Sequence, residues 1–250
     1  MIPALPDADC ALFFDFDGTL VNLAARPDEI QVHADVPRLL ARLEQALGGA
    51  VAVVSGRPLA QVDQHLRPLK LCVAGVHGTE RRGADGRVVH LAVRGLDEAS
   101  ALVQGVCERH PALRLEMKPG GMALHYRQAP ELEDLCLATM GQALALAEDM
   151  TLLRGKMVVE LKPRRAGKGL AIRSFLDEAP FRQRRPWFFG DDVADEAGFE
   201  VVQGLGGVAV KVGAGETLAA HHLADPDAVR HWLAAATELP LQPARNGAAR

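Results

Sequence analysis

The segment Ala11-Leu12-Phe13-Phe14-Asp15-Phe16-Asp17-Gly18-Thr19 decides how this chain folds and where its chemistry lies. The apolar run 11–14, closed by two acidic residues and a glycine, predicts a buried strand that ends in a loop. The carboxylates of Asp15 and Asp17 at such a strand end can share one Mg²⁺ and one phosphate. A carboxylate that attacks phosphorus forms an aspartyl-phosphate, so the segment predicts phosphoryl chemistry.

Two other structures are typical of an Asp-x-Asp-Gly segment, a surface turn and the start of a Ca²⁺ loop. A Ca²⁺ loop would continue with oxygen ligands and place a glutamate at its twelfth position. Here Leu20, Val21 and Leu23 follow, and Arg26 stands at the twelfth place counted from Asp15. The calcium alternative therefore fails, whereas a plain surface turn stays open on this segment alone.

The composition is that of a globular protein with one large or two smaller domains, because the chain has 250 residues and 48% hydrophobic content. A net charge of -4 gives no reason to expect nucleic acid or a membrane as a partner. The chain begins without a signal-peptide pattern and contains no apolar stretch of transmembrane length. The cysteines form no CxxC and the histidines no HExxH, so we expect a reduced, cytoplasmic protein without a zinc site. The oligomeric state stays open.

The two outer parts of the chain alternate short apolar strands with amphipathic helices. Strands are expected at 11–14, 50–54, 71–74, 187–189 and 207–212, and helices at 36–47, 58–66, 168–176 and 226–239. Asp225 and Pro226 suit the N-cap and first turn of the last helix. This alternation predicts an α/β core with a parallel sheet that helices cover on both faces.

The middle of the chain has strands that alternate polar and apolar residues, between amphipathic helices at 96–109 and 131–147. A two-residue turn at Gly120-Gly121 would pair 118 with 123, 116 with 125 and 114 with 127, which keeps both polar sets on one face. Residues 156–162 supply a third strand. We therefore expect an inserted α+β domain, an antiparallel sheet with helices on one side, at 92–164. The core takes 1–91 and 165–240, and 241–250 form a loose tail.

Polar residues directly follow three of the predicted parallel strands. Because the carboxyl ends of parallel strands meet at one edge of a sheet, we expect these residues to form one site. Lys168 opens a helix in the same half, where Gly167 is expected to permit close backbone approach. The residues that follow the strands are Asp15 and Asp17, Ser55 and Arg57, and Asp191, Asp192 and Asp195.

The oxygen groups of this site suit a magnesium ion, which prefers carboxylate, phosphate and water oxygens. We expect its protein ligands to be Asp15, Asp191 and the backbone carbonyl of Asp17. The Ser55 hydroxyl and the Lys168 ammonium can hold phosphate oxygens as charge builds on them. Each element alone is ordinary turn chemistry or a solvated charge, and the prediction depends on their order and placement.

These four elements resemble the four motifs of the haloacid dehalogenase superfamily of phosphatases, in the form Asp15-x-Asp17-x-Thr19, Ser55, Lys168 and Gly190-Asp191-x-x-x-Asp195. A narrower set is similar to the trehalose-6-phosphate phosphatases. That set is Gly75-Val76-His77-Gly78-Thr79-Glu80, Glu116-x-Lys118, Leu124-His125-Tyr126-Arg127, Glu160-Leu161-Lys162-Pro163, Gly167-Lys168-Gly169 and Gly190-Asp191-Asp192-Val193-x-Asp195-Glu196. One departure is Ala194, where that family usually has threonine, and we expect little effect on metal binding.

The resemblance implies an inserted cap domain and a Mg²⁺-dependent phosphatase of trehalose metabolism. Asp15 would attack phosphorus, and Asp17 would protonate the leaving sugar and then activate water. Thr19 and Ser55 would bond the phosphoryl oxygens, with Arg57 among the catalytic residues. Lys168 would stabilise Asp15 and the transferring group. Asp195 would orient Lys168 or a metal-bound water, and Asp192 would lie outside the direct metal ligands.

The resemblance also implies which residues bind the sugar: His77, Glu116, Lys118, His125, Arg127 and Glu160. From the expected register, Glu116 lies opposite His125, and Arg114 opposite Arg127. Like charges placed opposite each other are unfavourable unless a ligand or Glu160 compensates them. The alternative is a solvated sheet face with ordinary charges.

Other functions stay open or are disfavoured. A superfamily enzyme acting on sucrose phosphate, a mannosyl-glycerate phosphate or a hexose phosphate would share the same catalytic residues. A signalling receiver module would carry its acidic pair first and be about half as long. An inactive sugar-phosphate sensor would have lost residues that are present here, Asp15, Asp17, Lys168 and Asp191.

Overall fold

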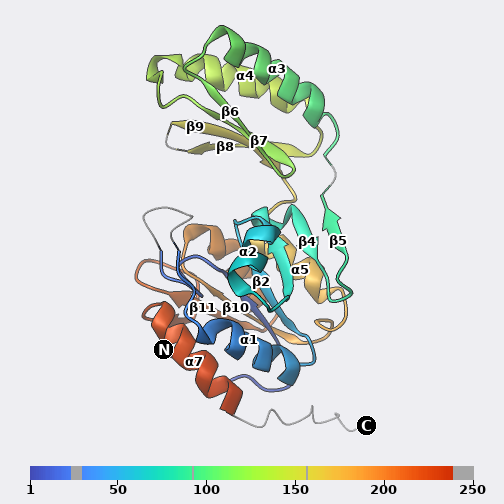
Figure 1. Ribbon diagram of the computed structural model, residues 1–250, viewed down its shortest axis with the longest axis vertical. Coiled ribbons are helices and arrows are strands. Elements are labelled where there is room, and N and C mark those ends of the chain that lie inside the picture. The colour runs from blue at the N-terminus through green and yellow to red at the C-terminus, as the bar shows by residue number, and fades with distance from the viewer. Residues whose placement is uncertain (24–29, 92, 156, 239–250) are drawn as a thin grey trace. The chain divides into compact units, whose positions relative to one another are not determined.

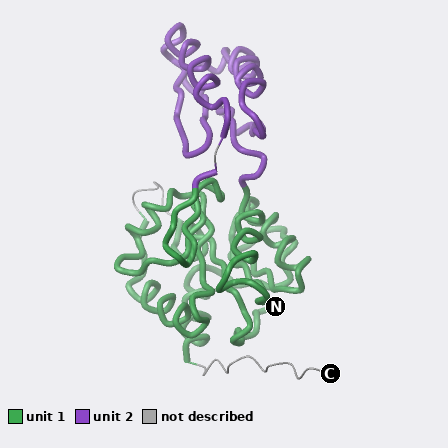
Figure 2. The backbone as a smooth tube through the Cα atoms, turned by 90° about the vertical axis from the view of Figure 1, so that its right-hand side faces the viewer, with its two compact units in different colours: residues 1–89, 167–250 green, residues 90–166 purple. Residues whose placement is uncertain are grey.

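A computed structural model describes residues 1–23, 30–91, 93–155 and 157–238. The chain forms two compact units, a core unit of residues 1–89 with 167–250 and an insert unit of residues 90–166 (Figure 2). The boundaries expected from the sequence, 92 and 164, each lie two residues inside the observed ones. The expected tail 241–250 lies outside the described residues.

The core unit contains an eight-stranded sheet with the order β12-β11-β10-β1-β2-β3-β4-β5. The first six strands in that order run parallel to their neighbours, as the sequence predicts, and β4 is antiparallel to β3. Their bounds are β1 Cys10–Phe14, β2 Val51–Val54, β3 Cys72–Gly75, β4 Glu80–Arg82, β5 Val88–His90, β10 Arg185–Gly190, β11 Val208–Val212 and β12 His221–Leu223.

The central strand β10 shows why its sequence is apolar throughout. Trp187 and Phe189 contact Trp232 of helix α7 (Pro226–Glu238). Phe188, between them, contacts Phe199 of helix α6 (Glu196–Gly204). Successive side chains of a strand point to opposite faces, so both faces of this strand are covered by helices.

The core helices pack in pairs: α1 (Asp35–Ala46) lies beside α7 (Figure 1), and α5 (Lys168–Leu176) packs against α6. Helix α2 (Leu59–Leu66) contacts β3 and β4. The Asp225 carboxylate accepts a hydrogen bond from the Ala228 amide at 2.8 Å, which confirms the predicted N-cap. The sequence analysis missed helix α6, which has nine residues, and the strands β4, β5 and β12, which have three residues each. Elements this short give little periodic signal.

The insert unit is a four-stranded antiparallel sheet with two helices on one face (Figure 1). Its strand order is β6-β7-β9-β8, and the sequence analysis missed β8. The helices and one face of the sheet enclose a separate apolar core that includes Met122, Leu124 and Met140. The bounds are α3 Leu96–Arg109, β6 Arg114–Lys118, β7 Gly121–His125, α4 Glu133–Leu146, β8 Met150–Gly155 and β9 Val158–Pro163.

The register of the β6-β7 hairpin differs from the predicted one. Lys118 pairs with Gly121 and Arg114 with His125, so the two-residue turn is Pro119-Gly120. Gly120 has a φ of 71°, and proline followed by such a glycine suits a type II turn. The predicted pairings 114–127, 116–125 and 118–123 are therefore wrong, and Glu116 lies opposite Ala123 instead of His125. The shift is an even number of residues, so the polar sets still share one face, as predicted.

Two further expectations concern side-chain chemistry and membranes. The four cysteines, three of which the sequence predicts to be small core residues, are all free and buried. Within the described parts of the chain, no helix is both long and apolar enough to cross a bilayer.

Candidate active site

The loop after β1 brings Asp15 into the interior, where its side chain is 5% exposed. The amides of Leu20 and Val21 donate to the Phe16 carbonyl, which closes the loop. Gly18 has a φ of 80°, and a Cβ at this position would collide with the Asp191 carboxylate. Glycine therefore permits both the left-handed backbone and the close approach of β1 to β10.

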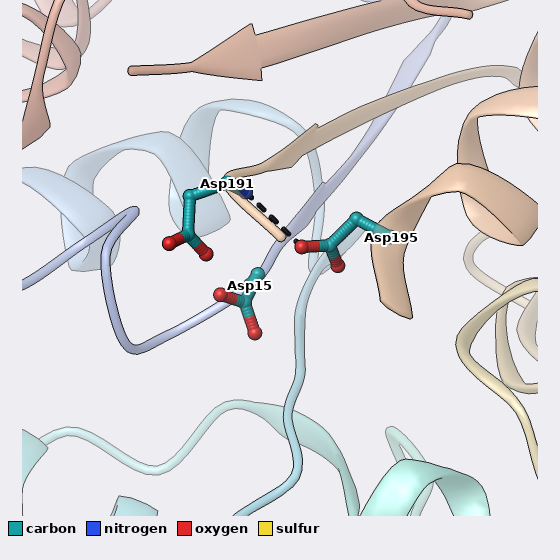
Figure 3. Close-up of side chains that lie close together, drawn as sticks. All are labelled: Asp15, Asp191 and Asp195. Atoms are coloured by element: carbon teal, nitrogen blue, oxygen red, sulfur yellow. Dashed lines mark hydrogen bonds between the residues drawn. The ribbon is translucent and has the colours of Figure 1, made fainter. Parts of the chain in front are cut away.

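Three carboxylates meet at the carboxyl ends of β1 and β10. Oxygens of Asp15, Asp191 and Asp195 all lie within 4.8 Å of one another (Figure 3). The Lys168 ammonium donates to Asp15 Oδ1 and to Asp195 Oδ1, both at 2.6 Å. Asp195 Oδ2 accepts the amides of Asp191 and Asp192, both at 3.0 Å. Asp15, Asp191, Asp195 and Lys168 therefore form one cluster, in which Asp191 is half-buried and the other three are buried.

Burial governs the ionisation of this cluster. Desolvation raises the pKa of Asp15 well above its ordinary value, although the Lys168 charge opposes the shift. Desolvation likewise raises the pKa of Asp191. Burial disfavours the charge on Lys168, but Asp15 and Asp195 outweigh it and raise the pKa of Lys168. Two clustered carboxylates that resist ionisation favour a cation beside them.

The donor set of the cluster fits Mg²⁺. Both oxygens of Asp195 accept hydrogen bonds, which leaves Asp15 and Asp191 as the carboxylates able to share a cation. The Thr19 hydroxyl is fully buried and has no hydrogen-bond partner among the described residues. An orphaned donor in the loop that follows Asp15 suits an incoming phosphoryl oxygen.

The loop after β2 carries Ser55 and Arg57. Ser55 is 1% exposed, and its Oγ accepts the Arg57 amide at 3.0 Å. The Arg57 guanidinium binds both oxygens of Asp17, Nε to Oδ2 at 2.6 Å and Nη2 to Oδ1 at 2.7 Å. The sequence analysis placed Asp17 and Arg57 in one site, but it did not predict this bidentate pair.

His77 lies in the core unit, in the short helical turn η1 (Val76–Gly78) after β3. Its amide donates to the Ser55 carbonyl at 2.9 Å, and its ring packs so closely on Gly56 that a Cβ there would be 2.9 Å from it. The structure therefore brings this predicted sugar-binding residue to the Ser55 loop.

Glu80 is a residue of this region that the sequence analysis did not select. It is 9% exposed, and its Oε1 accepts the Leu59 amide at 2.5 Å. That amide belongs to the first turn of α2, where a carboxylate satisfies an unpaired donor. The contact anchors the chain immediately after Arg57.

Lys168 is the first residue of α5, as predicted, but the reason given for its neighbour was wrong. A Cβ at Gly167 would meet no atom within 4 Å. The close approach is at Gly169, where a Cβ would lie 2.5 Å from the Ala197 carbonyl of α6. Glycine at 169 thus lets α5 pack against α6 and hold Lys168 in the cluster.

The turn after β10 orders the remaining acidic residues. The short helical turn η3 (Val193–Asp195) begins with a capping box, in which the Asp192 carboxylate accepts the Val193 amide at 2.6 Å. Asp192 is exposed, and its carboxylate is used to cap its own turn. The side chain of Ala194 is exposed as well.

A second buried lysine at the site was also missed. Lys211 of β11 is 5% exposed and donates from Nζ to the Asp191 carbonyl. Its only signal in the sequence is a lysine inside the otherwise apolar strand Val208-Ala209-Val210-Lys211-Val212.

The open face of the insert sheet carries four of the predicted sugar-binding residues. His125 Nε2 lies 2.8 Å from Glu116 Oε2, and Lys118 Nζ donates to Glu160 Oε1 at 2.6 Å. Arg127 lies beyond the end of β7, in an exposed turn. The structure thus brings the four together and leaves Arg127 outside the sheet.

Comparison with known protein families gives a consistent result. The sequence profile of the trehalose-phosphatase family matches residues 13–228. The chain is 42% identical over 228 residues to the trehalose-6-phosphate phosphatase of Escherichia coli, covering 90% of this chain and 86% of that protein. It is 42% identical over 206 residues to a probable trehalose-phosphate phosphatase of Sinorhizobium fredii, covering 81% and 77% of the two chains.

Solved structures agree on the fold. A crystal structure of a trehalose-6-phosphate phosphatase related protein superposes with a TM-score of 0.67 at 26% identity, covering 91% of this chain and 96% of that chain. A haloacid dehalogenase-like hydrolase from Bacteroides thetaiotaomicron superposes with a TM-score of 0.66 at 15% identity, covering 90% and 98%. The predicted fold, a haloacid dehalogenase-like core with an inserted α+β domain, is confirmed.

Proposed function

This chain belongs to the trehalose-phosphatase family and is a phosphatase of that family, and we propose that it hydrolyses trehalose 6-phosphate to trehalose and phosphate through an aspartyl-phosphate at Asp15. The observation that carries the mechanism is the contact of Lys168 with both Asp15 and Asp195 inside the buried carboxylate cluster. It holds one carboxylate at the end of β1, in the loop that also carries the orphaned Thr19 hydroxyl, where a phosphate ester can be attacked.

Asp15 is the proposed nucleophile. Its Oδ1 is fixed by Lys168 at 2.6 Å, which keeps the carboxylate in one orientation for in-line attack on phosphorus. Attack forms the Asp15–phosphorus bond and breaks the bond from phosphorus to the sugar oxygen. Hydrolysis of the aspartyl-phosphate then restores the Asp15 carboxylate.

Asp17 is the proposed acid and base. It lies two residues beyond Asp15 and is held by Arg57 through two hydrogen bonds. Asp17 would give its proton to the leaving sugar oxygen and later take one from the attacking water. Arg57 occupies both oxygens of Asp17, so substrate binding must free one of them before the first proton transfer.

The phosphoryl oxygens would be held by Thr19, Ser55 and Lys168. Thr19 offers a hydroxyl with no other partner among the described residues, and the Ser55 hydroxyl hydrogen is not used by the Arg57 contact. Lys168 carries the positive charge nearest to Asp15. Donors that are fixed in place before the reaction stabilise developing charge without reorganisation.

We propose that Asp15, Asp191 and the backbone carbonyl of Asp17 would hold Mg²⁺. When bound, Mg²⁺ supplies positive charge that neutralises the phosphoryl oxygens during transfer. The chain's own part is to present the two carboxylates on adjacent parallel strands, β1 and β10. Asp195 contributes by fixing Lys168 and the Asp191 amide, and Asp192 by capping the turn that carries Asp195.

The insert unit would recognise the sugar through the open face that carries Glu116, Lys118, His125 and Glu160. Paired acidic and basic groups at 2.6 and 2.8 Å offer both acceptors and donors to hydroxyl groups. Arg127 in the following turn, and His77 in the core unit, complete the proposed set of sugar-binding residues.

The test is phosphate release with Mg²⁺ from trehalose 6-phosphate, sucrose 6-phosphate, glucose 6-phosphate and an aryl phosphate. We expect a strong preference for trehalose 6-phosphate. Even activity, or preference for another sugar, would keep the phosphatase core and reject the assignment of the insert face. Retention of activity in Asp15→Asn would reject the mechanism.

A further inference from the structure

Lys211 is a buried cation that the proposed mechanism does not use. It lies in β11 directly opposite Gly190 of β10, and 5% of its surface is exposed. Among the described residues, no carboxylate oxygen forms an ion pair with its ammonium, whose one hydrogen bond is to the Asp191 carbonyl. Burying a lysine without a carboxylate partner is costly, so a lysine at this place indicates a specific role.

The contact of Lys211 completes a clamp on the Asp191 backbone. The Asp191 carbonyl accepts from Lys211, and the Asp191 amide donates to Asp195 Oδ2 at 3.0 Å. At the preceding residue, a Cβ on Gly190 would collide with the Asp195 carboxyl group. Two buried side chains from different elements therefore fix the backbone on both sides of the Asp191 Cα.

The clamped residue is the one whose side chain faces Asp15 (Figure 3). Its carboxylate stays beside Asp15 only while the backbone that carries it keeps its orientation. A ligand that is fixed beforehand loses less conformational entropy when a cation binds. Groups that orient metal ligands commonly change metal affinity by about 10- to 100-fold when they are removed.

We propose that Lys211 is a positioning residue that orients Asp191 for the divalent cation. This inference rests on the proposed metal site, and it adds a residue that lies outside the four motifs named above. Lys211 acts through the Asp191 carbonyl and does not touch the substrate. The role of Lys211 is thus to orient Asp191, because an apolar residue at this position would pack in the sheet equally well.

The experiment measures Mn²⁺ binding directly, by electron paramagnetic resonance of the full chain without substrate. Lys211→Met keeps the length and the apolar stem and removes the donor. We expect its dissociation constant for Mn²⁺ to rise tenfold or more. The melting temperature without metal should stay near that of the native chain, because a buried charge has been replaced by an apolar group. The Mg²⁺ concentration for half-maximal phosphatase activity should rise by the same factor.

Two further variants keep the test decisive. Lys211→Gln retains an N–H donor without the charge, so its loss of affinity should be smaller than that of Lys211→Met. If Lys211→Met loses the native circular dichroism spectrum, Lys211→Gln alone decides the test. Weaker Mn²⁺ binding by Lys211→Gln would then support the positioning role, and native Mn²⁺ affinity would overturn it. Lys70→Met changes an exposed lysine before β3 and should bind Mn²⁺ like the native chain.

Native affinity in both Lys211 variants overturns the inference, as does an equal loss in Lys70→Met. These outcomes leave the proposed function intact, because the native chain would still bind Mn²⁺ and release phosphate. Failure of the native chain to bind any divalent cation overturns the proposed metal site, and with it the positioning role.

Discussion

Asp195→Asn should destabilise the core unit, because Asp195 is fully buried and accepts three hydrogen bonds. One oxygen faces the Lys168 ammonium at 2.6 Å, and the other accepts the amides of Asp191 and Asp192 at 3.0 Å. Asparagine has one acceptor oxygen, and its NH₂ group must then point at an ammonium or at two N–H groups. Either orientation leaves buried donors without an acceptor.

The magnitude follows from the donors that lose their acceptor at Asp195, two backbone amides or the Lys168 ammonium, which together cost about 3–5 kcal/mol. In a chain of this size, 1 kcal/mol shifts the melting temperature by roughly 2–4 °C. We therefore expect the melting temperature of the core unit to fall by about 6–20 °C. Scanning calorimetry with EDTA measures this, and it separates the core transition from that of the insert unit if the two unfold apart.

The matched control is Asp15→Asn, the same chemical change in the same cluster. Lys168 keeps its contact with Asp195 in this variant. Burial raises the pKa of Asp15, so its charged form is disfavoured and removing the charge should leave the melting temperature unchanged or higher. Turnover should be lost, because the nucleophile is gone. A native melting temperature for Asp195→Asn, or an equal fall in both variants, would refute the reasoning.

Three other predictions concern the insert face, the metal and the thiols. Arg127→Ala should raise KM for trehalose 6-phosphate far more than for an aryl phosphate, which is too small to reach a sugar-binding residue; equal losses would argue against that role. Burial raises the pKa of Asp15 and Asp191, so protonation stabilises the metal-free fold at low pH and this stabilisation is lost as pH rises through the raised values. The increase in melting temperature with Mg²⁺ should therefore grow as the pH rises above about 4, the ordinary carboxyl value, and a pH-independent increase would contradict the assignment. Burial raises the pKa of Cys72 and Cys136 to about 11, so thiol reagents at pH 8 should react slowly with the native chain and rapidly after unfolding. Fast labelling of both thiols in the native chain would show that they are not buried.

The elements that the sequence predicted well are those with strong local patterns. The apolar strands β1, β2 and β10 and the helix α5 lie where their residues placed them. The strands β4, β5 and β12 were missed because they have three residues each, too few to show a period. The hairpin turn moved by one residue because proline and glycine fit a type II turn at Pro119-Gly120, and local sequence left both turns possible.

The features of the site likewise divide into those that the sequence predicted and those that only the structure shows. The residue types and their places after strands identified the carboxylate cluster, because strand order and hydrophobicity bring the carboxyl ends of parallel strands together. Contacts made by residues far apart in the chain carry no local signal. These include the Arg57–Asp17 pair, the Glu80 cap on α2 and the hold of Lys211 on Asp191.

The sequence alone was enough to predict the fold class, the inserted domain and the carboxylates that cluster at the strand ends, since hydrophobic periodicity and residue chemistry are local properties. Only the tertiary structure decided which charges neutralise one another. The Lys168 ammonium is shared by Asp15 and Asp195, whereas Lys211 has a carbonyl as its partner. The physical reason is burial, because desolvation makes the energy of each charge depend on neighbours that the folded chain, and not the sequence order, places within hydrogen-bond distance.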